Sequence, residues 1–193
     1  MAIANLFQIS VDELLSNEKS EKKQSNYIYE SRTEYDIDGK KNFDIKLGGA
    51  YAVDLKAYHG EKIEVAMFSN VYKNLLADYK VKIDDIKNRI DIDLNRFNEA
   101  SEADAKESLV ITIFIPIKYI GKIELSVNAG TLNITDIENE HIEVNGKISE
   151  VTLQGNKSEI EIDSNLDMQI SVLSHEGALE SCLLYTSPSP RDA

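Results

Sequence analysis

Side chains that could do chemistry are few in this chain of 193 residues, and their spacing matches no known site. No histidine has a second histidine four residues away or a cysteine partner, so the ligand spacing of a zinc site is absent. No serine lies in a G-x-S-x-G turn, and the chain has no glycine-rich phosphate-binding motif. The residues considered and set aside are His59, His141, His175, Ser10, Ser126 and Ser171. We therefore predict a non-enzymatic protein with no catalytic, cofactor-binding or metal-binding residue and no bound cofactor.

Three carboxylates need separate treatment because they recur at equivalent positions. Glu124, Glu143 and Glu161 would stack as an outward row. Like charges about 5 Å apart repel each other, which could favour a bound cation, and paired acids on a parallel β-helix could hydrolyse sugars. We favour a solvent-facing row that keeps the sheet soluble, with its charge compensated by lysines of the same repeats. These lysines are Lys122, Lys147 and Lys157.

A repeated segment between Ile120 and Ser174 must position these residues. The first residues of its three units stand 19 and 18 positions apart, and the second halves of the units repeat at 19 and 19. Apolar and polar residues alternate, as in a strand with one buried face, and Asn or Gly pairs mark the turns. The repeated apolar positions are Ile123, Leu125, Ile142, Val144, Ile160 and Ile162, followed by Leu132, Ile134, Val151, Leu153, Ile170 and Val172.

A repeat of about 20 residues with two short strands is typical of a β-solenoid, in which each coil buries its apolar face on the next. We predict an all-β fold: a β-solenoid, or parallel β-helix-like stack of 18-19-residue repeats, with preceding strands and a short N-terminal helical remnant. The expected parts are the helical remnant, a flexible linker, a strand-rich first part, the repeat region and a disordered tail. They cover residues 1–15, 16–26, 27–119, 120–180 and 181–193.

Upstream of the repeats the alternation favours strand after strand. Residues 79–83 and 89–94 flank a turn and predict a hairpin. Residues 109–117 predict either a strand buried on both faces or a strand that enters the solenoid at Pro116. A helical turn is expected within residues 71–77, and the acidic residues 95–108 are expected to form a mobile excursion.

The charge of the chain restricts its partners. Acidic residues outnumber basic ones by 34 to 21, which gives a net charge of −13. Such a surface repels nucleic acid backbones and anionic membranes, so we expect neither as a direct partner. The sequence shows no signal peptide and no apolar run of 18 residues, and its single cysteine, Cys182, excludes an intramolecular disulfide. A cytoplasmic location is therefore expected.

A first resemblance covers about residues 40–180. Upstream strands are followed by a V-x-I-P-like step, here Phe114-Ile-Pro116, and then by degenerate copies of I-x-x-x-(V/T)-N-A-G-x-(I/L)-x-I. This order resembles the adhesin-like β-strand-repeat domains of unknown function found in many bacteria. The unit from Ile123 to Ile134 matches closely, whereas the copy at Asn145-Gly146 lacks the alanine. The resemblance implies a fold rather than a function.

Residues 1–15 have two interpretations: an amphipathic lead-in that packs on the open end of the solenoid, or the end of a DNA-binding domain, which a second resemblance implies. The stretch ANLFQISVDELL is similar to the last helices of the five-helix DNA-binding domain of phage-repressor-like (Cro/C1-type) helix-turn-helix regulators, which close on A-x-x-F-x-(I/V)-S-x-(D/E)-x-L. The recognition helix of that family lies upstream, so the resemblance implies DNA binding only through a missing upstream domain. The residues that fit in register are Phe7, Ser10, Asp12, Glu13 and Leu14.

The end of the sequence departs from the rest of the chain. Residues 182–193 hold the only cysteine and two of the three prolines, and they resemble translated sequencing-adapter contamination. We expect this tail to be non-native and to lie outside the fold.

Three functions remain open. The first is the C-terminal sensing or self-association part of a truncated bacterial transcriptional regulator, associating through the solenoid edges. The second is a cell-surface adhesin-like binding domain. The third is a β-helix enzyme acting on polysaccharides. The sequence names no ligand for any of them.

Overall fold

The computed structural model describes residues 27–98, 100–164 and 167–183. The predicted helical remnant at residues 1–15 and linker at residues 16–26 lie outside the described residues, as does the tail beyond Leu183.

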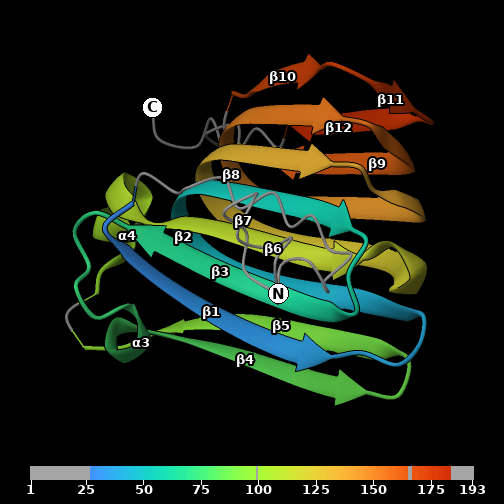
Figure 1. The fold of residues 1–193 in the computed structure, drawn as a ribbon. Coiled ribbons are helices and arrows are strands. Elements are labelled where there is room, and N and C mark those ends of the chain that lie inside the picture. Colours follow the sequence, from blue (N-terminus) through green and yellow to red (C-terminus); the bar gives the residue numbers. More distant parts are fainter. Residues whose placement is uncertain (1–26, 99, 165–166, 184–193) are drawn as a thin grey trace, which may run out of the picture.

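Strands make up most of the described chain, as predicted for an all-β protein (Figure 1). Short helical segments connect some of them: α3 (Leu75–Asp78), α4 (Glu102–Ser108) and the 3-10 turn η1 (Ile117–Tyr119). The strands are β1 (Tyr29–Asp36), β2 (Lys41–Tyr58), β3 (Lys62–Ser69), β4 (Tyr79–Ile86), β5 (Arg89–Arg96), β6 (Val110–Pro116), β7 (Ile120–Thr135), β8 (Glu138–Gln154), β9 (Asn156–Ser164), β10 (Gln169–Val172), β11 (His175–Glu176) and β12 (Leu179–Leu183).

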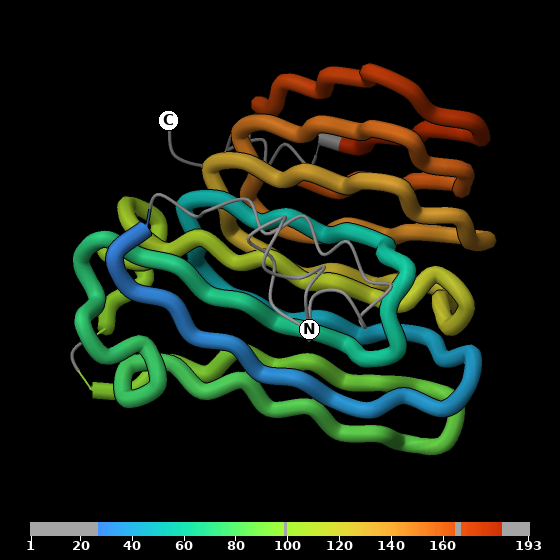
Figure 2. The backbone as a smooth tube through the Cα atoms, in the orientation of Figure 1, coloured from blue at the N-terminus to red at the C-terminus, as the bar shows by residue number. Residues whose placement is uncertain are grey.

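The long strand β2 divides the sheet into two layers. Its first half pairs in parallel with β5 and its second half pairs in parallel with β6, while both halves pair with β7. The register shifts between Lys46 and Gly48, where Gly48 has a φ of 68° that favours glycine. The strand therefore bends here, and β7 and β8 follow the same course (Figure 2). Layer 1 runs β4-β5-β2-β7-β8-β9-β12, and layer 2 runs β1-β3-β6-β2-β7-β8-β10.

The repeats pair in parallel with the predicted spacing. Ile123 is opposite Ile142, which is opposite Ile160, and Leu132 is opposite Val151. The repeated apolar residues of the first halves point into the core between the layers, as predicted. Their exposed fractions are 0% for Ile123, Leu125, Ile142, Val144 and Ile162, and 2% for Ile160.

The structure does not support a solenoid or parallel β-helix as the description of the whole fold. The sheet is mixed and open: β1 pairs with β3, β3 with β6 and β4 with β5, all antiparallel. The hairpin β4–β5 shows the physical reason, because a turn of only Lys87 and Asn88 joins the two strands and a parallel partner needs a long crossover. The predicted hairpin and the buried strand β6 are confirmed.

Two segment boundaries differ from the expectation. Within the expected excursion 95–108, residues 102–108 form α4, where the Ser101 side chain caps the helix by accepting a hydrogen bond from Asp104 N at 3.1 Å. Ala105 buries against the core, which anchors the helix. At the other end, β12 continues to Leu183, three residues into the predicted tail. Among the described helices, none has the length and apolar character needed to span a bilayer.

Candidate functional site

The three repeated glutamates belong to a longer acidic row on the outer face of layer 1. Glu124 is opposite Glu143, and Glu143 is opposite Glu161, as the repeat spacing predicts. The same line of the sheet continues in both directions with further carboxylates, because the strands β4, β5 and β2 join it in register. The complete row is Asp84, Asp91, Asp44, Glu124, Glu143, Glu161 and Glu180.

The aspartate half of this row is neutralised by its own strands. Lys46 Nζ lies 2.8 Å from an Asp44 carboxylate oxygen, and Arg89 Nε lies 2.6 Å from one of Asp91. The hydrogen bond to Asp44 raises the pKa of Lys46, as expected for a cation beside a carboxylate. Lys82 pairs with Asp84 in the same way. These cations compensate the three aspartates of the row.

The lysines predicted to compensate the glutamates interact elsewhere. Lys122 lies 3.8 Å from Glu140, and Lys157 lies 4.0 Å from Glu138 and from Glu176. Each of these acids is outside the row. No ion pair of Lys147 is recorded among the described residues. Among the described residues the three lysines therefore form no ion pair with the row, because they stand at different positions of their repeats: Lys147 is opposite Asn128 and Lys157 is opposite Glu138.

The acidic row has the geometry of a charged surface rather than a binding cage. Its side chains come from successive strands about 4.8 Å apart, all on one face. Glu124 is exposed, and Glu143 and Glu161 are half-buried. In the part of the chain that the structure describes, no group of three or more His, Cys, Asp or Glu side chains could hold a metal ion.

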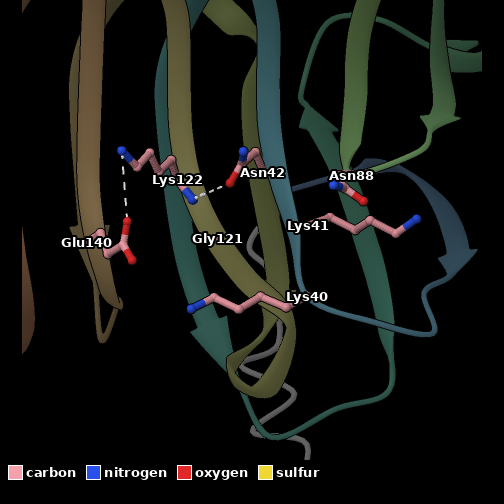
Figure 3. Close-up of a pocket in the computed structure, with 7 residues that line it drawn as sticks. All are labelled: Lys40, Lys41, Asn42, Asn88, Gly121, Lys122 and Glu140. Carbon is pink, nitrogen blue, oxygen red and sulfur yellow. Dashed lines mark hydrogen bonds and ion pairs between the residues drawn. The ribbon is translucent and has the colours of Figure 1, made fainter.

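A pocket of about 410 Å³ lies where β2 begins, beside β7 and β8 (Figure 3). Three lysines line it, yet Figure 3 shows them pointing in different directions. Lys41 points away from the other two and donates to Asp85 at 2.8 Å, Lys122 is directed toward Glu140, and Lys40 extends toward the same side as Glu140 at a separate level. The ammonium groups do not converge, so the pocket assembles no anion site. The other lining residues are Asn42, Asn88, Gly121 and Glu140.

The histidines and serines set aside from the sequence lie on separate elements of the fold. His59 lies in the exposed connection between β2 and β3, His141 in β8 and His175 in β11. Ser126 is exposed on β7 and Ser171 is half-buried on β10, while Ser10 lies outside the described residues. The structure brings none of these five described side chains together.

The feature that does stand out is the open end of the stack, formed by β10 and β12. Val172 is in register with Leu153, and Leu179 is in register with Ile160, so both occupy inward positions. Leu153 and Ile160 are 0% and 2% exposed, whereas Val172 and Leu179 are 50% and 36% exposed. Within the described residues, β10 pairs only with β8 and β12 only with β9. The last coil thus presents apolar side chains and unpaired strand edges together.

No protein-family model matches the chain, and no curated protein is significantly similar to it. Similar solved structures include a candidate cell adhesion protein from Clostridium sporogenes, with 7% identity and a TM-score of 0.42, over 79% of this chain and 97% of that one. Candidate adhesins from Parabacteroides merdae and Bacteroides fragilis follow. The first has 11% identity and a TM-score of 0.32 over 79% of this chain and 96% of that one. The second has 9% identity and a TM-score of 0.31 over 80% and 98%. Their names agree with the adhesin-like repeat that the residues around Asn128 resemble.

Proposed function

We propose that this chain is a non-enzymatic, adhesin-like β-repeat module that associates with a second copy of itself through the open end of its stack. The exposed inward residues Val172 and Leu179 carry the proposal. Inside the stack the equivalent positions are dry, because each coil is covered by the next. At β10 and β12 a second copy would supply that cover.

The backbone at the same end supports this role. An edge strand offers a row of N–H and C=O groups that pair readily with another strand unless charge or a covering element prevents it. Charged residues alternate along the edge strands at the other end of the sheet, for example Lys80 and Lys82 on β4 and Arg32 and Glu34 on β1, whereas β10 is Gln169-Ile-Ser-Val172. The uncharged edge is therefore the favoured site of strand pairing between copies.

The experiment is sedimentation velocity on the full chain over a range of concentrations. The parent is expected to associate as its concentration rises, and Val172→Lys to remain monomeric, because pairing would bring two ammonium groups together in an apolar contact. Leu173→Lys, at a side chain 68% exposed, provides a second variant with little cost to folding. Ile86→Lys on β4, at a side chain 48% exposed, is the matched control and should behave like the parent. A parent that stays monomeric, or an association that survives both edge lysines, would contradict the proposal.

We further propose that the module is the C-terminal sensing or self-association part of a longer, cytoplasmic transcriptional regulator. The support is the resemblance of residues 1–15 to the end of a helix-turn-helix domain. Association of two modules would then fix the spacing of two DNA-binding heads. A gel shift at low salt tests this: the chain as given should not bind duplex DNA, and a chain extended by its upstream coding sequence should. Binding by the given chain alone would contradict it.

Two other functions stay as alternatives. A cell-surface adhesin-like domain would be favoured if the upstream coding sequence held a signal peptide or a membrane helix instead of a helix-turn-helix. A polysaccharide-active enzyme would require paired carboxylates, which neighbouring glutamates of the acidic row would have to supply. Release of reducing sugar that is lost in Glu143→Gln would favour the enzyme over the binding module.

A further inference from the structure

The two strands at the open end of the stack differ in charge. β10 is Gln169-Ile-Ser-Val172 and carries no charged side chain, whereas β12 carries Glu180. Glu180 is opposite Glu161 and belongs to the acidic row, so pairing of β12 with its own copy would bring two acidic rows together. Association at the open end therefore favours β10 as the strand that pairs.

The backbone groups of β10 face two sides in alternation. Leu173 N donates to Leu153 O at 2.9 Å, so the backbone of Leu173 faces β8. Because successive residues of a strand direct their N–H and C=O groups to opposite sides, Ile170 and Val172 present both groups to the open edge. Within the described residues, β10 has no partner strand on that side. Two residues thus offer all the hydrogen-bonding groups of this edge.

These directions restrict how two copies of β10 can pair. Opposite residues of an antiparallel pair direct their side chains to the same face, so an inward residue must meet an inward residue. Ile170 and Val172 are the inward residues of β10, because they are opposite the buried Val151 and Leu153. Ile170 of one copy can therefore lie opposite Val172 of the other, with Ser171 at the centre. This register leaves no residue of β10 unpaired.

We propose that two copies form a closed dimer in which β10 pairs antiparallel with its own copy about a two-fold axis at Ser171, an arrangement that rests on the self-association proposed above. Ile170 and Val172 exchange both backbone hydrogen bonds across the interface, and the axis repeats this pair. Their side chains meet on the inward face and extend the core of layer 2 into the second copy. The two Ser171 residues form the pair without hydrogen bonds, with Cα atoms about 4.5 Å apart.

Charge at the other end of the sheet limits the assembly to two copies. A head-to-tail contact would pair β10 with β1 or β4, which are the edge strands there. Both carry alternating charges, and Arg32 of β1 already pairs with Glu64 of its own sheet at 3.4 Å. Such side chains disfavour pairing of an edge strand with another chain. A two-fold interface uses the uncharged edge of both copies and leaves only edges that carry charge, so growth stops at the dimer.

Disulfide trapping in the full chain tests this register. A Cys182→Ser background removes the free thiol of the chain, and Ser171→Cys then places two thiols at a Cα separation suited to a disulfide. Gln169→Cys is the matched control: its side chain is exposed, but the two copies of this position stand about 13 Å apart, beyond the reach of a disulfide. At a concentration where the parent associates, Ser171→Cys should form the linked dimer at least ten-fold faster than Gln169→Cys.

Amide hydrogen exchange in the parent gives a second measurement that requires no substitution. The amides of Ile170 and Val172 should become protected as the protein concentration rises, because they acquire partners only in the dimer. The amide of Leu173 is bonded to β8 in each copy, so its protection should change far less.

The outcomes separate this pairing from the self-association on which it rests. A parent that stays monomeric in sedimentation velocity overturns both. Association with equal trapping rates at the two positions, without added protection of Ile170 and Val172, or with species larger than a dimer overturns the two-fold pairing and leaves self-association standing.

Discussion

The two ends of this sheet differ in whether their apolar side chains are covered. At the antiparallel end, α3 lies against β1, β3 and β4, and the rings of Tyr72 and Tyr79 meet edge to face at 5.2 Å. Tyr79 is 1% exposed there. At the parallel end, Val172 and Leu179 occupy inward positions and are exposed. We call these the closed end and the open end.

This difference shows that a sequence repeat can set the register of a sheet without covering the apolar face of its last coil. Each coil provides an apolar face for the next one, so a stack of identical coils always leaves one face uncovered. At the closed end this need is met by residues that follow no repeat: a helical turn and aromatic side chains. The closed end also carries ion pairs between neighbouring strands, such as Lys62–Glu34 at 3.2 Å. Charged side chains of this kind disfavour pairing of the edge strand with another chain.

The strongest test of the parallel stack is a charge in its interior. Val144→Asp should destabilise the protein by about 4 kcal/mol, because it buries an unpaired carboxylate at a side chain that is 0% exposed. Ser126→Asp, at an exposed side chain of the neighbouring strand β7 and opposite Lys46, is the control and should cost far less. Urea unfolding measures both. Equal stability of Val144→Asp and the parent would refute the inward register.

A pair of glycines compares the interior with the open end directly. A Cβ at Gly146 would lie 1.8 Å from Val127 O, and one at Gly177 would lie 2.0 Å from Ser158 O, with φ angles of 145° and 128°. Gly146→Ala should cost about 3 kcal/mol, because both the clash and the backbone conformation are unfavourable.

Gly177→Ala should cost less in global unfolding, since the last coil can open locally to relieve the same clash. Gly39→Ala meets no atom within 4 Å and should be neutral. Chemical denaturation measures the loss in the global free energy of unfolding, and hydrogen exchange measures the local opening of the last coil. If both alanines cost the same, the open end is as firmly held as the interior.

The closed end predicts a dependence on alkaline pH. Burial raises the pKa of Tyr79, since the tyrosinate is poorly solvated there. The folded state therefore favours the protonated side chain. The contribution of Tyr79 to the free energy of unfolding is complete below the pKa of an unfolded tyrosine, about 10, and it is lost as the pH rises above that value. Between pH 10 and 11 this residue should remove about 1 kcal/mol of stability. Tyr79→Phe should remove this loss of stability between pH 10 and 11 in urea titrations. If the free energy of unfolding falls with pH as steeply in Tyr79→Phe as in the parent, water reaches the Tyr79 hydroxyl and the prediction is wrong.

The smallest effect is expected on the acidic row. Glu143 has like charges on both neighbouring strands, so Glu143→Gln should stabilise the protein by about 0.5 kcal/mol at low salt. The gain should shrink as ionic strength rises, because these side chains are reached by solvent. Glu107→Gln on α4, outside the row, is the control. Thermal melts at two salt concentrations test the prediction, and a gain independent of salt would exclude repulsion as its cause.

The repeat region could be predicted because its signal is local. Ile123, Ile142 and Ile160 recur within a continuous stretch, and parallel pairing keeps that spacing as a register. The strand β2 belongs to the same ladder, with Phe43 opposite Ile123, yet it lies upstream of β3 to β6. The spacing of the repeats could not reveal that β2 pairs with them, because four other strands, β3 to β6, lie between β2 and β7 in the sequence.

The site-like features were harder to predict for the same reason. The glutamates of the acidic row were found from the repeats, whereas Asp44 and Asp91 enter it through pairings between distant segments. The cations that neutralise them, Lys46 and Arg89, are local to those strands and were therefore missed as well. The separate apolar cluster of Ala66, Phe68 and Val110 could not be predicted either, because each of these residues reads in its own strand as an ordinary core residue.

The place of β2 in the ladder also has a consequence for how the chain is made. The later strands can pair in both layers only with a strand that already bends at Gly48, which is β2. This strand is synthesised before β7, β8 and β9. Each later coil then adds to a template that has left the ribosome before it. We expect the slow step of folding to be the first long-range pairing of β7 with β2, and the later coils to follow it quickly as the chain emerges.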